Sequence, residues 1–343
     1  MLLAPNTLDL APHAAEVVAA LDGDPRFKVE MPAAQLEIVT APHPTVRAAA
    51  HELASARRVL EASVAGRHRI AGAGAHPFAA GVGPLNPGPR YEAIGAEYAT
   101  MAQRQLVFGL HVHVAIRGAD RALAVYNALR SHLPDLAALA ANAPFYEGRD
   151  TGLASIRSRI SGLLPRQGVP PALASWEAYA EALRWTGIAD PRQWWWELRL
   201  HPTLGTVEVR VPDTQTTVAD TAALAAVVHA LTTRLAARHD ARDTPPVAES
   251  WRIDQNRWSA CRHGVAGAMT DLVTGRRQPT RRRIEAMLDD LAPYASELGC
   301  AAEIARARAL LDAGGADRQR AVAAEHGLRG LAGWLADGFT GRE

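Results

Sequence analysis

Three short apolar stretches of this chain carry polar side chains at alternate positions. They are Gln35-Leu36-Glu37-Ile38, His111-Val112-His113-Val114 and Glu208-Val209-Arg210-Val211. Because alternate residues of a β-strand share a face, each stretch is expected to form a strand with one apolar and one polar face. Three such strands side by side would form a sheet with carboxylates, imidazoles and a guanidinium on one face. This combination predicts a site for metal ions and phosphate.

Each pattern by itself also fits an ordinary strand with one solvated face. A Glu-x-Arg sequence such as Glu208-Val209-Arg210 is often only a solvated charge pair. The three patterns together favour a site, because a solvated strand usually carries Thr, Lys or Arg rather than His, Glu and Gln.

Composition restricts the class of protein. The chain has 343 residues, 48% of them hydrophobic, which is enough for one large or two small domains with a buried core. Its formal net charge of +1 suggests neither a nucleic acid nor an anionic membrane as a partner. No apolar run is long enough to cross a bilayer, and Cys261 and Cys300 make no disulfide framework. We therefore expect a soluble cytoplasmic protein that acts on small molecules.

Lysine is nearly absent, since Lys28 is the only one in the chain. A phosphate-binding loop of the Walker type needs a Lys after its glycines, and Schiff-base chemistry needs a Lys amine. The Arg26-Phe27-Lys28-Val29 sequence provides neither setting. If the protein handles phosphate, arginines and metal ions must hold it.

Helices and short strands alternate without a regular repeat, which predicts an α+β fold with an antiparallel sheet. A further strand at 194–201 is expected to turn through Pro202-Thr203-Leu204-Gly205 into the strand that carries Glu208, so that Arg199, Glu208 and Arg210 share one face. Helices are expected at 44–66, 89–106, 118–141, 172–186, 216–240 and 251–274. Residues 1–280 are expected to form the catalytic domain, and residues 281–343 a helical segment packed on it.

Four blocks of the sequence resemble the bacterial carboxylate–amine ligases of the glutamate–cysteine ligase type 2 family, in the same order. They are Gly109–Val114, the stretch around Asn142-Ala143-Pro144-Phe145-Tyr146-Glu147-Gly148-Arg149-Asp150-Thr151-Gly152, Gly205–Gln215 and Asn256–Gly264. The likeness runs from about residue 1 to residue 335.

The resemblance implies a glutamine-synthetase-like antiparallel sheet whose polar face forms a funnel, backed by helices. It also implies that ATP phosphorylates a carboxylate, typically the γ-carboxylate of glutamate. An amine, typically that of cysteine, then attacks the acyl phosphate to give an amide. The cofactors implied are ATP and Mg²⁺, and a homodimer is the assembly that the family suggests.

The resemblance also implies roles for individual residues. Four are implied metal ligands: Glu30, Glu37, His111 and Glu208. Arg210 is expected to reach the transferred phosphoryl group. Three further arginines are candidates for holding substrate carboxylates or ATP phosphates, namely Arg149, Arg157 and Arg199, although a structural salt bridge is an equal alternative for each. Asn256 and Arg257 are candidate nucleotide contacts, with helix packing as the alternative.

Two polar residues beside the implied ligands have less certain roles. His113 is either a ligand or a partner of His111. Gln35 is expected to donate a hydrogen bond to substrate or to a ligand carboxylate.

Members of the family begin with a strand that carries a Gly-x-Glu-Glu-Glu motif, which precedes a segment like Leu2-Leu3-Ala4-Pro5. This chain starts directly at that segment. The expectation is either an upstream start or a shortened member with an incomplete metal site. Two other functions remain possible. One is an inactive homologue that binds glutamate or nucleotide as a sensor. The other is a metal-dependent hydrolase, because a His-x-His motif is also the first part of the metal site in amidohydrolase barrels.

Overall fold

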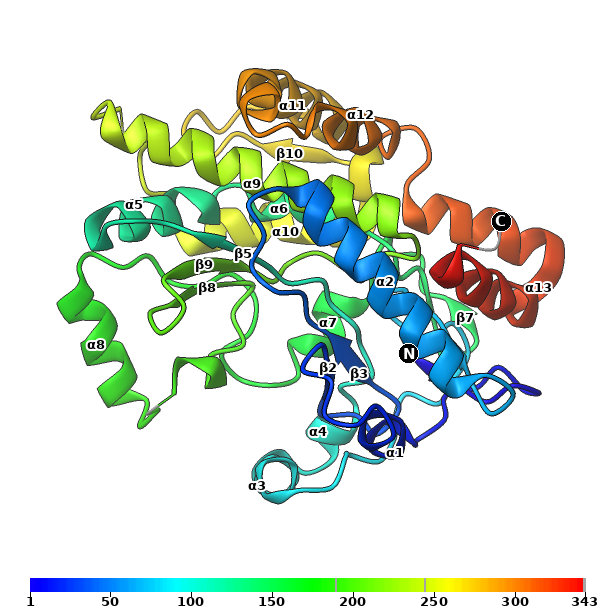
Figure 1. Cartoon of the computed structure of the whole chain (residues 1–343). Helices are drawn as coiled ribbons and strands as arrows, with labels where there is room; N and C mark the ends of the chain where they lie inside the picture. The colour runs from blue at the N-terminus through cyan, green and yellow to red at the C-terminus, as the bar shows by residue number, and fades with distance from the viewer. Residues whose placement is uncertain (189, 244, 342–343) are drawn as a thin grey trace.

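The computed structural model describes residues 1–188, 190–243 and 245–341 (Figure 1). Its α-helices are α1 (Ala14–Ala19), α2 (Val46–Val64), α3 (Pro89–Tyr98), α4 (Thr100–Gln103), α5 (Ala119–Arg130), α6 (Leu133–Leu139), α7 (Arg157–Ser161), α8 (Trp176–Trp185), α9 (Val218–Asp240), α10 (Ser250–His263), α11 (Thr280–Glu297), α12 (Ala301–Ala309) and α13 (Gly315–Thr340). Two 3₁₀ turns, η1 (Pro191–Gln193) and η2 (Gly264–Ala266), interrupt the loops. The strands are β1 (Leu2–Leu3), β2 (Phe27–Val29), β3 (Leu36–Ile38), β4 (Arg69–Ile70), β5 (Val112–Ala115), β6 (Phe145–Tyr146), β7 (Arg149–Asp150), β8 (Leu198–His201), β9 (Thr206–Val209), β10 (Ala268–Thr270) and β11 (Arg277–Pro279).

A three-stranded antiparallel sheet in the order β5-β9-β8 lies at the centre of the fold. The turn expected at 202–205 joins β8 to β9, and its last residue, Gly205, has a φ of 63° that suits glycine. The register places His113 opposite Glu208 and Glu208 opposite Arg199. Residues opposite each other in neighbouring strands share a face, so the predicted polar face exists and includes Arg199.

One expectation about the sheet is wrong. The strand that carries Glu37, β3, pairs with β2 in a separate hairpin and is not hydrogen-bonded to β5, β8 or β9. The chain between β2 and β3 is short and turns back on itself, with the amide of Glu30 donating to the carbonyl of Gln35. The backbone hydrogen bonds of β3 are therefore made locally with β2. Glu37 approaches the polar residues of the three-stranded sheet from this separate hairpin.

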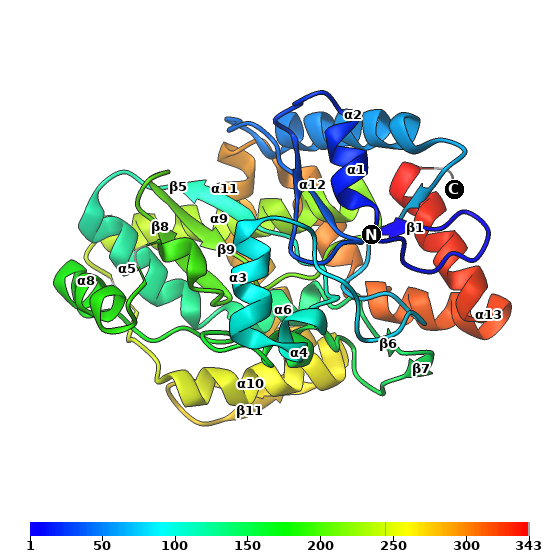
Figure 2. The ribbon, with the colours of Figure 1, turned by 90° about the horizontal axis from the view of Figure 1, so that it is seen from below.

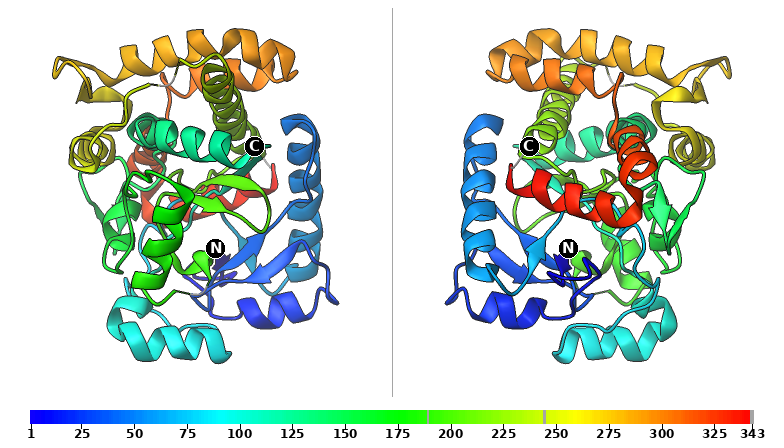
Figure 3. Two further views of the ribbon diagram at one scale, coloured as in Figure 1. Left: turned by 90° about the vertical axis from the view of Figure 1, so that its left-hand side faces the viewer. Right: turned by 90° about the vertical axis from the view of Figure 1, so that its right-hand side faces the viewer.

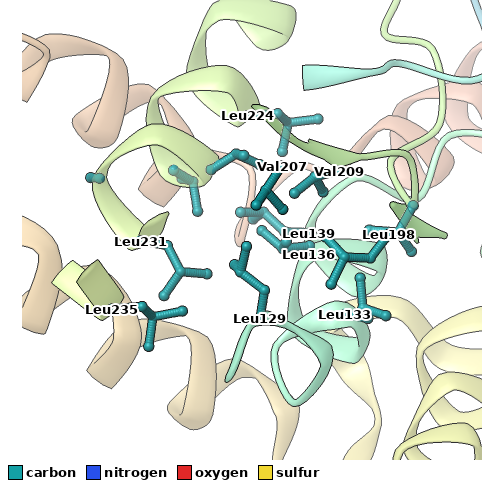
Figure 4. Packing of buried hydrophobic residues seen from close by; sticks show 14 of the residues in the cluster. Leu129, Leu133, Leu136, Leu139, Leu198, Val207, Val209, Leu224, Leu231 and Leu235 are labelled. Carbon is teal, nitrogen blue, oxygen red and sulfur yellow. The ribbon is translucent and has the colours of Figure 1, made fainter. Parts of the chain in front are cut away.

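The opposite face of the sheet is apolar and forms the main core. Leu198, Val207 and Val209 are fully buried there and pack against Leu224 and Leu231 of α9 (Figure 4). Leu129 of α5 and leucines of α6 complete this layer. Because apolar and polar residues alternate, one face of the sheet packs against helices and the other face is free to form a site.

Helix α9 is the central helix, and it begins where the side chain of Thr217 accepts a hydrogen bond from the amide of Asp220. Helices α11 and α12 pack on α9 (Figures 1 and 3), and α11 contributes Leu288 and Leu291 and α12 contributes Ile304 to the same core. Helices α11 and α12 therefore share the core of the sheet domain, while the boundary expected at residue 280 stays a prediction.

Several expected helices are shorter than their sequence patterns suggested. The segment 118–141 is divided into α5 and α6, and 89–106 is divided into α3 and α4 at Ala99, whose φ is 47°. The helix expected at 251–274 ends at His263, because Gly264 takes a φ of 54° and the chain continues into β10. Glycine and turn geometry decided these ends rather than hydrophobic periodicity.

The expected fold class is confirmed, since helices surround small antiparallel sheets. Seen from below, the three-stranded sheet lies between α8 on one side and α1 and α2 on the other (Figure 2). Within the described residues, none of the helices has the length and apolar character needed to cross a membrane.

Candidate functional site

A cavity of about 970 Å³ adjoins the polar face of the β5-β9-β8 sheet and the β2–β3 hairpin. Its wall is rich in ionisable groups. Those that line it are Lys28, Glu30, Glu37, Arg57, Arg90, Tyr91, His111, His113, Arg157, Asp190, Arg192, Glu197, Arg199, His201, Glu208 and Arg210. A cavity of this size with convergent polar groups is typical of small-molecule sites.

Glu208 lies at the centre of this wall, and two arginines hold its carboxylate. Arg199 donates from Nε and Nη2 to Oε2 at 2.8 and 2.7 Å. Arg210 donates from Nη1 to Oε1. Burial alone would raise the pKa of Glu208, but Arg210 and Arg199 outweigh it and lower the pKa to about 2. Glu208 is therefore a permanent carboxylate at neutral pH.

Two histidines lie against the same oxygen of Glu208. Its Oε1 is 3.7 Å from Nδ1 of His111 and 3.6 Å from Nε2 of His113. Burial, with Arg210 as the next cause, holds the pKa of His111 well below its usual value, and burial also lowers the pKa of His113. Both rings are therefore neutral at pH 7, and His113 also bonds Oγ1 of Thr206 at 3.0 Å.

Glu37 reaches this group from the β2–β3 hairpin, with its Oε1 4.0 Å from Nδ1 of His111. Burial first, and the nearby carboxylate of Glu30 second, raise the pKa of Glu37 to about 7. Lys28 stands opposite Glu37 in the hairpin and opposes this shift. The hairpin thus adds the carboxyl groups of Glu30 and Glu37 to a wall that also contains several arginines.

The implied metal ligands come close together but do not form a coordination shell. Within residues 1–188, 190–243 and 245–341, no three His, Cys, Asp or Glu side chains converge closely enough to hold an ion. The physical reason is that Arg210 and Arg199 occupy both oxygens of Glu208. In this conformation the set Glu30, Glu37, His111 and Glu208 does not fit a divalent cation.

Arg157, a candidate for holding substrate carboxylates or ATP phosphates, fixes the backbone at the end of β9, where Arg210 lies. Its Nη2 donates to the carbonyl of Arg210 and its Nη1 to that of Val211, both at 3.1 Å. Nη1 also lies 3.8 Å from Oδ1 of Asp213. Arg157 still lines the cavity, and its buried Nε has no hydrogen-bond partner among the described residues.

Glu197 supports Arg210 from the other side and was missed by the sequence analysis. Its carbonyl accepts the amide of Arg210 at 2.8 Å, and its carboxylate accepts Nε and Nη2 of Arg257 at 2.7 and 2.5 Å. Residue 197 lies two before Arg199, so the same alternation that identified Arg199 could have found it. His201, two residues further along, lines the cavity for the same reason.

Three of the expected site residues lie outside the cavity. Arg149 is exposed in the β6–β7 hairpin. Asn256 is buried, where its side chain bonds both the carbonyl and the amide of Thr270 at 2.7 and 2.8 Å. Arg257 is buried against Glu197 rather than open to a nucleotide. For Asn256 and Arg257, these contacts agree with helix packing, the alternative to a nucleotide contact. Gln35, in contrast, lines the cavity.

The sequence of this chain matches a known protein family. The sequence model of glutamate–cysteine ligase family 2 matches residues 5–331. The chain belongs to glutamate–cysteine ligase family 2. A "putative glutamate–cysteine ligase 2-3" of Rubrobacter xylanophilus is 41% identical over 98% of this chain and 94% of its own length. A "putative glutamate–cysteine ligase 2" of Gloeobacter violaceus is 34% identical over 98% of this chain and 93% of its own.

Two solved structures share the fold of this family 2 chain at low sequence identity. A glutamate–cysteine ligase from Francisella tularensis, determined in complex with AMP, aligns with a TM-score of 0.72 and 13% identity over 99% of this chain and 87% of that one. A bifunctional glutathione synthetase from Pasteurella multocida aligns with a TM-score of 0.67 and 15% identity, over 93% of this chain and 48% of that one.

Proposed function

We propose that this chain is an ATP-dependent carboxylate–amine ligase that forms a γ-glutamyl amide, as in γ-glutamylcysteine, through an acyl phosphate. The observation that carries the proposal is the placement of Arg210. Its backbone is held by Glu197 on one side and Arg157 on the other, and its side chain faces a cavity beside a buried carboxylate. A guanidinium fixed in this way suits the charge of a phosphoryl group in transfer.

The chemistry explains why such a group is needed. A carboxylate is a poor acyl donor, because its leaving group would be oxide. One carboxylate oxygen therefore attacks the γ-phosphorus of ATP, and the bond from that phosphorus to the bridging oxygen of ADP breaks. The amine nitrogen then attacks the acyl carbon, phosphate leaves, and the nitrogen loses a proton. Positioning and charge neutralisation supply most of the catalysis in phosphoryl transfer.

Each arginine has a distinct part in this proposal. Arg210 contacts the transferred phosphoryl group, and its Nε, buried without a partner among the described residues, is a donor available to an anion. Arg199 holds Glu208, with its Nη1 anchored by the carbonyls of Arg192 and Trp194 at 2.8 and 3.1 Å. Arg157 acts through the backbone of Arg210 as a positioning residue. No step here depends on a cation, and Mg²⁺ remains a prediction from the family resemblance.

Two considerations support ATP and small substrates. The Francisella tularensis ligase, which shares the fold, was solved with AMP bound. The cavity volume of about 970 Å³ is sufficient for a nucleotide and an amino acid together. The hydrolase alternative predicted a regular β/α barrel, and the antiparallel β5-β9-β8 sheet does not provide one.

The test is ADP release with mass spectrometry of the products, using Mg-ATP with glutamate and cysteine and then a panel of other acids and amines. ADP release that requires both an acid and an amine, with formation of the amide, is the expected result. Replacing Arg210 by Lys should lower kcat by about 10²-fold or more, because a point charge replaces a fixed fork.

Arg121→Met is the matched control. Arg121 forms an exposed ion pair with Asp240 that lies outside the cavity, so this variant should keep full activity. Binding of nucleotide or glutamate without turnover of any substrate pair would refute the ligase and indicate the sensor.

A further inference from the structure

A separate cavity of about 240 Å³ lies where the C-terminal end of α10, the loop after β7 and the first turn of α13 meet. Among the described residues, none that lines it also lines the cavity of about 970 Å³. Three of its lining residues, Ala141, Ala154 and Ala316, form a small buried apolar cluster of their own. The cavity therefore has an apolar wall outside the main core, and its volume suits one small molecule rather than a nucleotide.

Four Asp and Arg side chains line this cavity, and two of them neutralise each other. Arg320 donates from Nε and Nη2 to the two carboxylate oxygens of Asp150 at 2.8 and 2.9 Å. Arg320 also donates to the carbonyl of Leu153 at 2.8 Å, so the pair is fixed to the loop after β7. A bidentate pair of this kind has little capacity left for a ligand.

The other two charged residues, Arg262 and Asp317, have opposite charge and form no ion pair in the part of the chain that the structure describes. Arg262 is exposed in the last turn of α10, and its guanidinium donates to the carbonyl of Gly152. Asp317 is exposed in the first turn of α13. One cation and one anion beside an apolar wall are the complement of a zwitterion that carries an apolar side chain.

We propose that this cavity binds a free α-amino acid with an aliphatic side chain. The carboxylate of the amino acid accepts hydrogen bonds from Arg262, its ammonium group lies against Asp317, and its side chain contacts the alanines. This inference does not rest on the proposed function, because none of the residues that line this cavity has a part in the ligase reaction.

A ligand with a single charge fits the cavity less well than a zwitterion. A simple anion that binds Arg262 is repelled by the carboxylate of Asp317, and a simple cation that binds Asp317 is repelled by Arg262. A zwitterion turns each of these repulsions into an attraction. The two charges of the cavity therefore select for a molecule that has both an ammonium and a carboxylate group.

The backbone beside the cavity shows what a bound amino acid would restrain. The amides of Ala154 and Ser155 donate to the carbonyl of Cys261, at 2.9 and 3.1 Å. Cys261 directly precedes Arg262, so the loop after β7 is bonded to the same turn of α10 that carries the partner of the ligand. A ligand that links this turn to α13 should therefore make local opening of the loop less frequent.

The test measures binding of L-valine by NMR titration and involves no turnover. Its matched probes are isovalerate, which lacks the ammonium group, and isobutylamine, which lacks the carboxylate. We expect L-valine to bind the wild type about tenfold more tightly than either probe, because each probe makes only one of the two charge-assisted contacts.

Variants of the two exposed charged residues assign each contact. Arg262→Met should weaken L-valine binding about tenfold and abolish its advantage over isobutylamine, because neither molecule then has a partner for a carboxylate. Asp317→Asn should weaken L-valine binding similarly and abolish its advantage over isovalerate. Arg121→Met, in an ion pair that lies outside this cavity, should bind L-valine like the wild type. Arg210→Met should also do so, which distinguishes this site from the cavity that Arg210 lines.

A second measurement uses the unaltered protein. L-Valine should slow hydrogen exchange of the amides of Ala154 and Ser155, because the linked helices hold the loop closed.

Four results would overturn the inference. They are an absence of saturable L-valine binding to the wild type, equal L-valine affinity in the wild type and in both charge variants, isovalerate that binds as tightly as L-valine, and unchanged exchange of these two amides. None of them would bear on the ligase proposal, since that depends on ADP release and amide formation.

Discussion

The guanidinium of Arg157 lies directly against the backbone of Gly109, in space that a Cβ atom on residue 109 would occupy. From there Arg157 reaches the carbonyls of Arg210 and Val211 on the neighbouring strand segment. The absence of a side chain at residue 109 is thus what allows one arginine to position another. This relationship joins the Gly-Leu-His-Val-His-Val block to the end of β9.

Replacing Gly109 by Ala should displace Arg157 and loosen the strand end that carries Arg210. In the ligase assay we expect kcat to fall by about 10- to 100-fold with little change in KM for glutamate, because orientation rather than binding is lost. Gly95→Ala, within helix α3, is the matched control and should leave kcat unchanged. If Gly109→Ala has wild-type kinetics, Arg157 does not position Arg210 in the way proposed.

The buried Glu197–Arg257 pair should be costly to break from one side. Arg257→Met would leave the carboxylate of Glu197 buried without its bidentate partner, and we expect the free energy of unfolding to fall by about 3–5 kcal/mol. Urea denaturation measures this change. The double variant Glu197→Gln with Arg257→Met should recover part of the loss, and a double variant less stable than the single one would contradict this account.

His76 should make the protein sensitive to acid. Its Nε2 bonds the carbonyl of Leu8 at 2.8 Å, and its Nδ1 accepts the amides of Phe78 and Ala79 at 3.2 and 2.9 Å, so the ring is neutral. Burial lowers its pKa to about 4. Between about pH 6.5 and 4 the unfolded chain binds a proton at this position and the folded chain does not.

The contribution of His76 to stability is therefore complete above about pH 6.5 and is lost as the pH falls toward 4. The slope expected from this one group is up to about 1.4 kcal/mol per pH unit. The control is His76→Asn, whose amide oxygen can replace the Nδ1 acceptor without titrating. Urea titrations at several pH values should show a shallower slope for this variant, and identical slopes would refute the assignment.

The C-terminal helices should unfold together with the catalytic sheet. Leu288 of α11 is fully buried in the same core as Leu224 and Leu231 of α9. Leu288→Ala should lower the free energy of unfolding by about 2–5 kcal/mol and move a single cooperative transition. Two separate transitions in calorimetry would show instead that residues 281–343 form an independent unit.

The central sheet could be predicted from the sequence because its signals are local. Alternation in 111–114 and 208–211, with a turn at 202–205, placed His113, Glu208 and Arg199 on one face, and the register of β5, β9 and β8 agrees. Helix ends were less predictable, since the termination of α10 depends on the backbone at Gly264 rather than on hydrophobic periodicity.

Long-range contacts account for what the patterns did not reveal. The pairing of Arg257 with Glu197 joins residues 60 apart, and the contact of Arg157 with the carbonyl of Arg210 joins residues 53 apart. Periodicity identifies the face on which a side chain lies, but not the partner that it meets across the fold. For the same reason Glu37 could be assigned to the site while its strand was placed in the wrong sheet.

By itself, the sequence determined the fold class, the ligase family and the polar strands that line the cavity, because periods of two and 3.6 and the ordered motifs are properties of neighbouring residues. Only the tertiary structure decided which carboxylate meets which guanidinium. Two arginines hold the carboxylate of Glu208, whereas the side chain of Glu37 has no hydrogen-bond partner among the described residues. That difference arises from burial and packing between distant segments, and it separates a closed ion-pair cluster from the carboxyl groups of the hairpin at the same cavity.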